Sequence, residues 1–404
     1  MLSFIIFKRK MKHIIIRNLG PIKNIEVDLK RINLVIGPQS SGKSTFLKVV
    51  CYCTWVERQV MRTQDPDLFC NGDIFITNLV EFHKLEGYLK ADTYISYVTD
   101  YTSITYDAKL NTCEFRWQDE RWNYRGTKIS YIPAERNIVS VIPNWYQIKM
   151  EPNNLFSFMS DWEDTRKNFD NKERILSLPF NYIYDKKTGT DKIILNNGEE
   201  ISLINASSGI QSLVPLVMTI NFLTGDFFNK ENSTVEISKL YFDLLDKLIK
   251  SNDSFPETSE DVLQKFIIAR KLFFPEFASF FIEEPEAHIF PSTQKDFVYN
   301  LVEKLNNERQ HTCFIATHSP YIMTAINNLI LANERFAESE EIKNKILTRF
   351  SEQHLLPFND VAAFAMESGN VKDILDYDFK MILSDALDSA SESIANDYDY
   401  LLGL

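Results

Sequence analysis

The chain changes between two hydrophobic patterns, and this change predicts an α/β fold. Continuous apolar runs at 31–36, 280–282 and 312–316 are typical of strands buried within a sheet. Amphipathic stretches at 237–249 and 262–272, separated by polar breaks, are typical of helices. We therefore expect a mixed central sheet flanked by helices.

Further patterns predict what surrounds this sheet. Strands of a flanking meander are predicted at 101–106, 112–117 and 128–132. Turn signals inside 181–203 predict a β-hairpin lobe, and apolar spacing over 379–402 predicts one helix face that packs on this chain or on a partner. The predicted organisation is a main α/β head at 1–224 and 275–330, a helical insertion at 225–274 and an acidic helical C-terminal region at 331–404.

Composition is typical of a soluble intracellular protein of enzyme size. The 404 residues are 44% hydrophobic, which is ample for a core, and no apolar run reaches the ~18 residues of a membrane span. Charges follow the first apolar stretch, the reverse of a secretory signal, and Met11 is as good a start as Met1. Five cysteines without a C-x-x-C pair argue against a disulfide framework and a zinc site. We expect a cytoplasmic protein.

Charge is distributed unevenly along the chain. The net charge of −12 disfavours a surface that attracts nucleic acid as a whole. Positions 1–31 carry eight basic and two acidic residues, whereas nine acids and only Lys372 and Lys380 follow from Glu367 onward. The acidic end is either a solvated face or a docking site for a basic partner.

One motif predicts nucleotide binding. Residues 37–44 have the pattern G-x-x-x-x-G-K-[ST] between a strand-like run and a helix start, a context that a chance glycine-lysine loop lacks. We expect Lys43 to reach the β- and γ-phosphates of ATP and the Ser44 hydroxyl to bind Mg²⁺. The predicted nucleotide contacts here are Gly37, Pro38, Gln39, Ser40, Ser41, Gly42, Lys43, Ser44 and Thr45.

Two strand ends predict the hydrolytic groups. An apolar strand ends in Glu283 and Glu284, which we expect to hold the metal and to orient the attacking water, respectively. A second apolar strand ends in His318, which is placed to sense the γ-phosphate. The alternatives are an ordinary acidic strand end and a structural histidine.

A serine-glycine segment at a predicted helix start forms the last candidate site. Ser207, Ser208, Gly209 and Gln211 precede an apolar helix, so that N–H groups and hydroxyls are available to an anion. Taken alone, this segment is equally typical of a helix cap. Together with the other motifs it indicates a signature loop that contacts nucleotide.

These motifs, in this order, resemble the ABC-type ATPase heads of the OLD (overcoming lysogeny defect) and SMC-like families. Residues 131–137, the Ser207–Gly209 loop and 283–288 further resemble the stand-alone ATPases of the anti-phage systems PARIS and Septu. The resemblance covers about 12–330 and departs at Ile210, where the second signature glycine is expected, and at Glu283, where aspartate is usual. No Q-loop glutamine is identifiable, and Glu135-Arg136 is a candidate for that position.

The resemblance implies an ATP hydrolase whose heads pair as a homodimer or higher homo-oligomer. The function that we expect is a Mg²⁺-dependent defence ATPase whose nucleotide state senses infection, through a phage-derived trigger, and controls a separately encoded effector such as a nuclease or toxin. The alternative is a RecF- or SMC-like ATPase of DNA repair, for which DNA is a possible partner that the charge does not indicate. A transporter ATPase is a weaker alternative, since its signature-to-glutamate spacing is far shorter. We expect no membrane partner.

Overall fold

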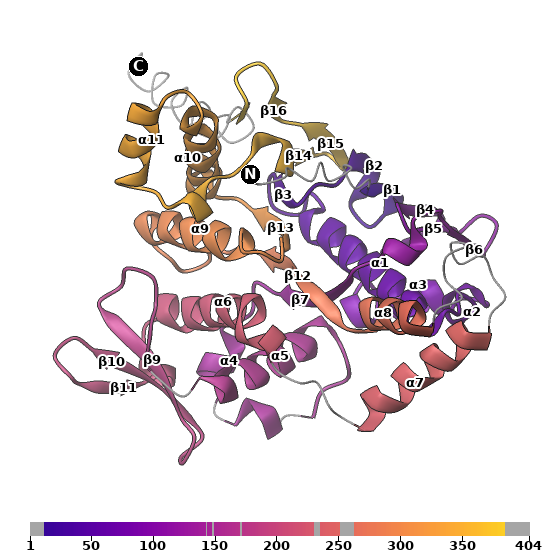
Figure 1. The fold of residues 1–404 in the computed structure, drawn as a ribbon, viewed down its shortest axis with the longest axis horizontal. Helices are drawn as coiled ribbons and strands as arrows, with labels where there is room; N and C mark the ends of the chain where they lie inside the picture. Colours follow the sequence, from indigo (N-terminus) through magenta and orange to yellow (C-terminus); the bar gives the residue numbers. More distant parts are fainter. Residues whose placement is uncertain are drawn as a thin grey trace, which may run out of the picture.

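A central sheet of 11 strands organises the chain in the computed structural model (Figure 1). The structure describes residues 12–142, 144–147, 149–169, 172–229, 235–250 and 262–383. The strand order is β6-β5-β4-β1-β2-β15-β14-β3-β13-β12-β7. In chain order these strands are β1 (Lys12–Leu19), β2 (Ile22–Asp28), β3 (Ile32–Ile36), β4 (Leu89–Thr99), β5 (Thr102–Asp107), β6 (Thr112–Trp117), β7 (Gly126–Ile132), β12 (Pro275–Glu283), β13 (Thr312–Thr317), β14 (Val361–Glu367) and β15 (Asn370–Asp373).

Five neighbouring strands, β14, β3, β13, β12 and β7, run parallel. Their register aligns the carboxyl ends: Ile36 lies opposite Thr317, and Ala316 lies opposite Glu283. The segments that follow β3, β12 and β13 therefore leave the sheet at one edge. This is where α/β proteins place their ligands.

The other half of the sheet is antiparallel and differs in part from the predicted meander. β4, β5 and β6 form consecutive antiparallel pairs, as expected. The predicted strand at 128–132 belongs instead to β7, which crosses to the opposite edge and runs parallel to β12. Most of β7 is buried, which suits a parallel strand covered by helices on both faces better than an open meander.

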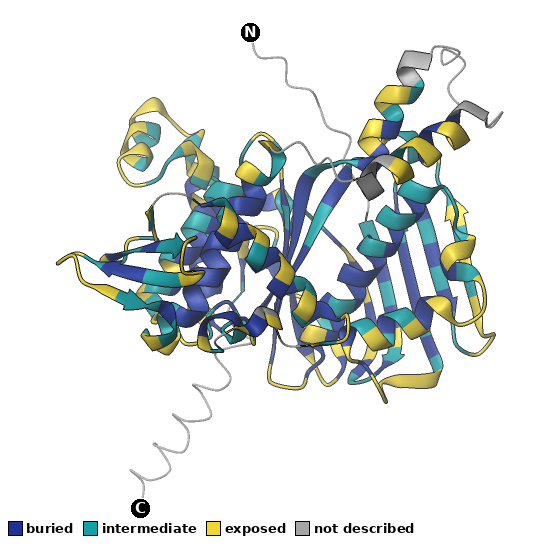
Figure 2. Ribbon diagram, turned by 90° about the horizontal axis from the view of Figure 1, so that it is seen from below, coloured by how far each residue is buried: buried dark blue, intermediate teal, exposed yellow. Residues whose placement is uncertain are grey.

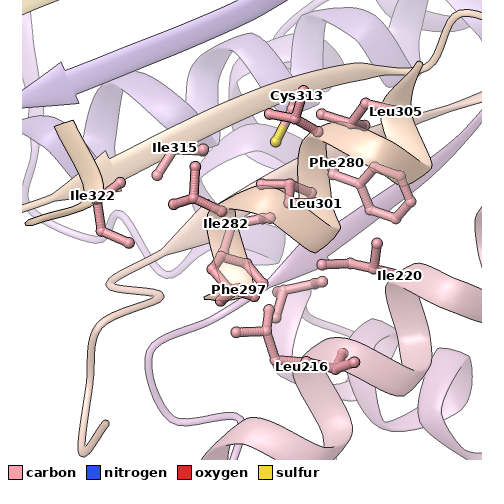
Figure 3. Close-up of a cluster of buried hydrophobic side chains, with 14 of the residues drawn as sticks. Leu216, Ile220, Phe280, Ile282, Phe297, Leu301, Leu305, Cys313, Ile315 and Ile322 are labelled. Carbon is pink, nitrogen blue, oxygen red and sulfur yellow. The ribbon is translucent and has the colours of Figure 1, made fainter. Parts of the chain in front are cut away.

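Alternate side chains of the parallel strands enter two separate cores. Leu34, Phe280 and Ile282 pack with helices on one face, and Figure 3 shows Phe280 and Ile282 in this core. Val35 and Phe281 point to the other face, where the ring of Phe281 stacks on Phe314 at 4.7 Å. Figure 2 shows both helical layers around the buried sheet. Period-two alternation with both faces apolar is why these strands read as continuous hydrophobic runs.

Two groups of helices cover the sheet. Helices with residues in the core around Val35 are α1 (Lys43–Thr63), α2 (Asp67–Cys70) and α3 (Ile74–His83). Helices with residues in the core around Leu34 are α4 (Ile138–Val141), α5 (Asn154–Asn168), α6 (Ser208–Thr224), α9 (Pro291–Leu305) and α10 (Pro320–Phe336). α11 (Glu340–Leu347) follows α10 and has no buried residue.

The predicted hairpin lobe and helical insertion both form. The lobe is a separate four-stranded antiparallel sheet with the order β11-β10-β9-β8. Its strands are β8 (Glu173–Arg174), β9 (Phe180–Asp185), β10 (Thr190–Leu195) and β11 (Glu200–Ser202), and the insertion contains α7 (Val235–Lys250) and α8 (Val262–Phe273). α7 and α8 pack through Leu244, Leu248 and Leu272 onto Tyr124 and Met61, a small core distinct from the two main ones.

The expectation of an acidic helical region at 331–404 is wrong for residues 361–382. β14 is hydrogen-bonded to β3 in parallel, and β15 continues the sheet to β2. Six of the seven residues of β14 are buried, so this segment is a sheet strand despite the acidic residues around it. A short hairpin follows, made of β16 (Leu375–Asp376) and β17 (Met381–Ile382). Most of the helix face predicted at 379–402 lies outside the described residues.

Among the described residues, one helical stretch, Ser208–Asn229, is apolar and long enough to span a membrane. Its apolar window is 72% buried inside the protein. It contributes Leu216 and Ile220 to the core shown in Figure 3. This burial is what a core helix shows, and the stretch is weak support for a membrane span.

Candidate nucleotide-binding and hydrolysis site

The loop at 37–44 joins β3 to α1 through three left-handed backbone positions. Gly37 has φ 147°, Ser40 has φ 60° and Gly42 has φ 105°. A Cβ atom at position 37 would lie 2.3 Å from the carbonyl oxygen of Met366, at the end of β14. Both the backbone angle and the lack of space therefore require glycine there. The loop leads into the N-terminus of α1, where free N–H groups and the helix dipole favour a phosphate.

The predicted contact residues of this loop divide between surface and interior. Pro38, Gln39, Ser40 and Ser44 are exposed, and Ser41, Lys43 and Thr45 are buried. The Ser41 hydroxyl oxygen is buried without a hydrogen-bond partner among the described residues. Because an unpaired buried hydroxyl is costly, this orphaned group fits a loop that closes around phosphate oxygens. ATP therefore fits this loop.

Lys43 lies folded against its own loop. Its Nζ donates hydrogen bonds to the carbonyl oxygens of Gly37 at 2.8 Å and Pro38 at 2.7 Å. Burial lowers the pKa of the Lys43 ammonium to about 8, while the carboxylates of Glu284 and Glu286 oppose this shift. Lys43 thus lies within electrostatic reach of the turn that follows β12. The structure brings the two predicted halves of the site together.

Tyr131 holds the carboxylate that ends β12. The Tyr131 hydroxyl donates to Glu283 Oε1 at 2.6 Å, and Glu283 is only 6% exposed. Burial, together with the neighbouring Glu283 carboxylate, raises the pKa of the Tyr131 hydroxyl, which therefore stays protonated as a donor. Sequence reasoning missed Tyr131, although its position at the end of β7 faces β12 directly.

Ser44 and Glu283 supply the oxygen donors that Mg²⁺ prefers. Within the described ranges, no three histidine, cysteine, aspartate or glutamate side chains lie close enough together to hold a metal ion. Mg²⁺ usually keeps only one or two protein ligands and takes the rest from phosphate and water. Ser44 and Glu283 therefore fit a Mg²⁺ ion that arrives with the nucleotide.

Glu284 and His318 come together at the carboxyl ends of β12 and β13. The distance from His318 Nε2 to Glu284 Oε1 is 3.7 Å, and both side chains are partly exposed. The main-chain N–H of Glu284 donates to Ala316 at 2.8 Å, and that of His318 donates to Glu286 Oε1 at 2.6 Å. No role was predicted for Glu286 from the sequence. In the structure its carboxylate joins the turn after β12 to the end of β13.

Arg136 binds the main chain of the same turn. Its side chain is fully buried, and its guanidinium donates to the carbonyl oxygens of Glu283 and Glu284, each at 3.0 Å. Arg136 is therefore not the Q-loop residue that the sequence offered as a candidate, because its N–H groups donate to main-chain carbonyl oxygens of this chain. Glu135 is exposed and stays a candidate.

The serine-glycine loop begins α6 as predicted. Ser207 and Ser208 are exposed, and the Ser207 side chain makes no cap hydrogen bond. A Cβ at Gly209 would lie 2.7 Å from the carbonyl oxygen of His288, so the loop packs closely on the turn after β12. Gln211, predicted as a nucleotide contact, is instead buried and donates to the carbonyl oxygen of Ile204 at 2.8 Å. It stabilises the approach to the helix.

One family profile and several solved structures are similar to this chain. The profile of the AAA domain family matches residues 13–356. No curated protein matches the chain. Among solved structures, the SMC head domain from Thermotoga maritima is 11% identical with a TM-score of 0.39, and covers 91% of this chain and 98% of its own. The recombination mediator protein RecF is 11% identical with a TM-score of 0.32, and covers 91% of this chain and 98% of its own. The family profile spans most of the chain, and the chain therefore belongs to the AAA domain family, as an ATP-hydrolysing P-loop enzyme with an α/β fold.

Proposed function

We propose that two copies of this chain pair around ATP and that the pairing is the signal the protein delivers. The observation that carries this proposal is the exposure of Ser207 and Ser208 at the start of α6. They lie beside the turn at 283–288, which we call the catalytic turn. A serine pair that only capped the helix would turn a hydroxyl onto it, and Ser207 does not. Phe290, 75% exposed at the end of the same turn, adds an apolar anchor for a partner.

Each side chain of the site has a distinct role in hydrolysis. Lys43 leaves the carbonyl oxygens of its loop to bind the β- and γ-phosphates. Ser44 and Glu283 would hold Mg²⁺, which would supply charge neutralisation at the phosphates. Glu284 aligns and deprotonates the attacking water, and His318, 3.7 Å from Glu284, senses the γ-phosphate. The serine loop of the second copy completes the site across the interface.

Light scattering tests the pairing. Glu284→Gln, which binds ATP but turns it over slowly, should change with ATP from 47.1 kDa to about twice that mass. In the same background, Ser208→Arg places a bulky charge in the interface and should stay monomeric. Ser160→Arg, at an exposed position of α5, is the matched control and should pair normally. A monomeric mass for Glu284→Gln with ATP contradicts the proposal.

We further propose that the paired heads act in anti-phage defence by holding a separately encoded effector. The support is the insertion, which the ATPase chemistry does not require and in which Phe242 is 61% exposed and Ile267 is 48% exposed. Exposed aromatic and aliphatic side chains on a protruding helix pair are typical of a protein-binding surface. The net charge of −12 disfavours DNA, which the repair ATPase alternative requires.

Co-purification with the product of the adjacent gene tests this second proposal. Phe242→Glu combined with Ile267→Glu should abolish capture while leaving ATP turnover unchanged. Lys239→Glu, an exposed change on the same helix, should capture normally. Phage challenge of cells carrying both genes should show protection that Lys43→Ala removes. Salt-sensitive binding of duplex DNA, with no capture of the neighbouring product, would instead favour the repair function.

A further inference from the structure

The turn that presents Glu284 is conformationally demanding. Glu284 has φ 42° and His288 has φ 66°, both in the left-handed region that favours glycine. Non-glycine residues occupy this region at a cost and remain there when surrounding contacts hold them. Two main-chain hydrogen bonds hold the turn: the N–H of Glu284 donates to the carbonyl oxygen of Ala316, and the N–H of Ala287 donates to the carbonyl oxygen of Glu284. Besides main-chain N–H groups, the carbonyl oxygens at the start of the turn have a side-chain partner.

Arg136 is that partner. Besides the carbonyl oxygens of Glu283 and Glu284, its guanidinium donates to the carbonyl oxygen of Pro285 at 3.3 Å. Three successive carbonyl groups therefore converge on one planar cation. A guanidinium has five N–H donors in a fixed plane, whereas a lysine ammonium has three on one atom. Lysine therefore cannot reproduce the arrangement.

The same guanidinium also reaches two other elements. Arg136 Nε donates to the carbonyl oxygen of Ser212 in α6 at 3.2 Å, and Nη1 donates to that of Pro133 after β7 at 3.4 Å. A second contact joins α6 to the turn independently, because Gly209 packs against His288. The helix that begins at the serine loop and the turn that carries Glu284 are thereby connected through one side chain.

We infer that Arg136 is a positioning residue that sets the orientation of Glu284 and couples it to the serine loop. This inference rests on the proposed role of Glu284 in hydrolysis. Arg136 does not touch nucleotide, since all its donors point to main-chain oxygens and its side chain is fully buried. It acts through the backbone of the turn. A small rotation of that backbone moves the carboxylate that must align the water.

The cation is stable enough for this role. Burial lowers the pKa of the Arg136 guanidinium to about 10, and the carboxylates of Glu286, Glu284 and Glu283 oppose the shift. The group therefore stays protonated at neutral pH. A neutral side chain of similar length would leave the three carbonyl oxygens of the turn without a charged donor at a position where the Arg136 side chain is fully buried.

Turnover, nucleotide affinity and thermal stability should be measured together for Arg136→Lys and Arg136→Gln. We expect turnover to fall about a hundredfold while the dissociation constant for ATP changes less than about threefold. Arg166→Lys is the matched control, because Arg166 is a buried arginine that pairs with Glu163 and Asp191 instead. It should lose stability comparably and keep its turnover.

A double variant separates positioning from general damage. If Arg136 acts through Glu284, then Arg136→Lys combined with Glu284→Gln should be no slower than Glu284→Gln alone. Multiplied losses overturn the inference, and so does normal turnover in Arg136→Lys. If Glu284→Gln itself turns over normally, the proposed role of Glu284 fails together with the inference. Normal turnover confined to Arg136→Lys leaves the role of Glu284 intact. Where Arg136→Gln does not fold, Arg136→Lys decides.

Discussion

The phosphate loop and the catalytic turn lie at the same sheet edge but are built in different ways. The loop at 37–44 takes its shape from its own glycines, and Lys43 is bonded within it. The turn at 283–288 is held by side chains from elsewhere, including Tyr131 and Arg136. A contiguous motif therefore specifies phosphate binding, whereas tertiary contacts set the geometry for hydrolysis. Binding and turnover should be separable by mutation.

The largest effect is expected at the loop. Lys43→Ala removes the cation that we propose holds the phosphates, so both ATP binding and turnover should fall by at least about a thousandfold. Isothermal titration with ATP and a phosphate-release assay measure the two quantities. Lys48→Ala, five residues further along the same helix, should leave both nearly unchanged. Retained binding in Lys43→Ala would show that the loop does not hold ATP through this residue.

At the turn, Glu284→Gln should have a different effect from Lys43→Ala, because it should lower turnover and leave ATP binding intact. Loss of the group that we propose aligns or deprotonates water should lower turnover about a hundredfold or more, while ATP affinity is kept. Single-turnover kinetics with equilibrium binding measure this split. Glu303→Gln on α9 is a control for removing an acidic side chain. Unchanged turnover in Glu284→Gln would move the general-base role to His318.

An intermediate effect is expected at Tyr131. Tyr131→Phe removes the hydroxyl that donates to Glu283, so the Mg²⁺ concentration for half-maximal turnover should rise about tenfold or more. Tyr182→Phe is a close control, since the buried Tyr182 hydroxyl donates to Asp191 at 2.7 Å. Both variants should lose about 1–2 kcal/mol of stability. Equal Mg²⁺ dependence in the two variants would show that Tyr131 has no role in holding the metal.

The smallest effect concerns the support of β12 and β13 at their opposite ends. Buried His311 accepts the N–H of Ala278 through Nδ1 at 2.8 Å, and burial lowers the pKa of its imidazole to about 4. Because the unfolded chain takes up this proton near pH 6.5, stability should fall by about 2–3 kcal/mol as the pH drops from 6.5 to 4. Above pH 6.5 the His311 imidazole should have no effect on how stability depends on pH.

Urea unfolding at several pH values measures that loss. His311→Asn keeps an acceptor for the Ala278 N–H but does not titrate, so its stability should depend less on pH over the same range. Above pH 7 the difference in stability between wild type and variant should no longer change with pH. An equal acid dependence of the two proteins would assign the loss to other groups.

Local patterns were sufficient for much of the architecture. Strand-like runs predicted β3, β12 and β13, whose continuous apolar sequences suit strands buried on both faces. Turn residues predicted the hairpin lobe, and helical spacing predicted α7 and α8. Two predictions were wrong for one reason. β7 and β14 join the parallel half of the sheet through partners that are far away in sequence, and no local signal encodes a partner.

For the site, the sequence by itself determined the phosphate loop, because eight consecutive residues carry both the backbone freedom and the charge that phosphate binding needs. It also placed Glu283, Glu284 and His318 at strand ends. Only the tertiary structure decided that these ends meet, that Gln211 faces inward and that Tyr131 and Arg136 hold the turn. The physical reason is that strand register and buried hydrogen bonds depend on contacts between residues some 150 positions apart, such as Tyr131 and Glu283.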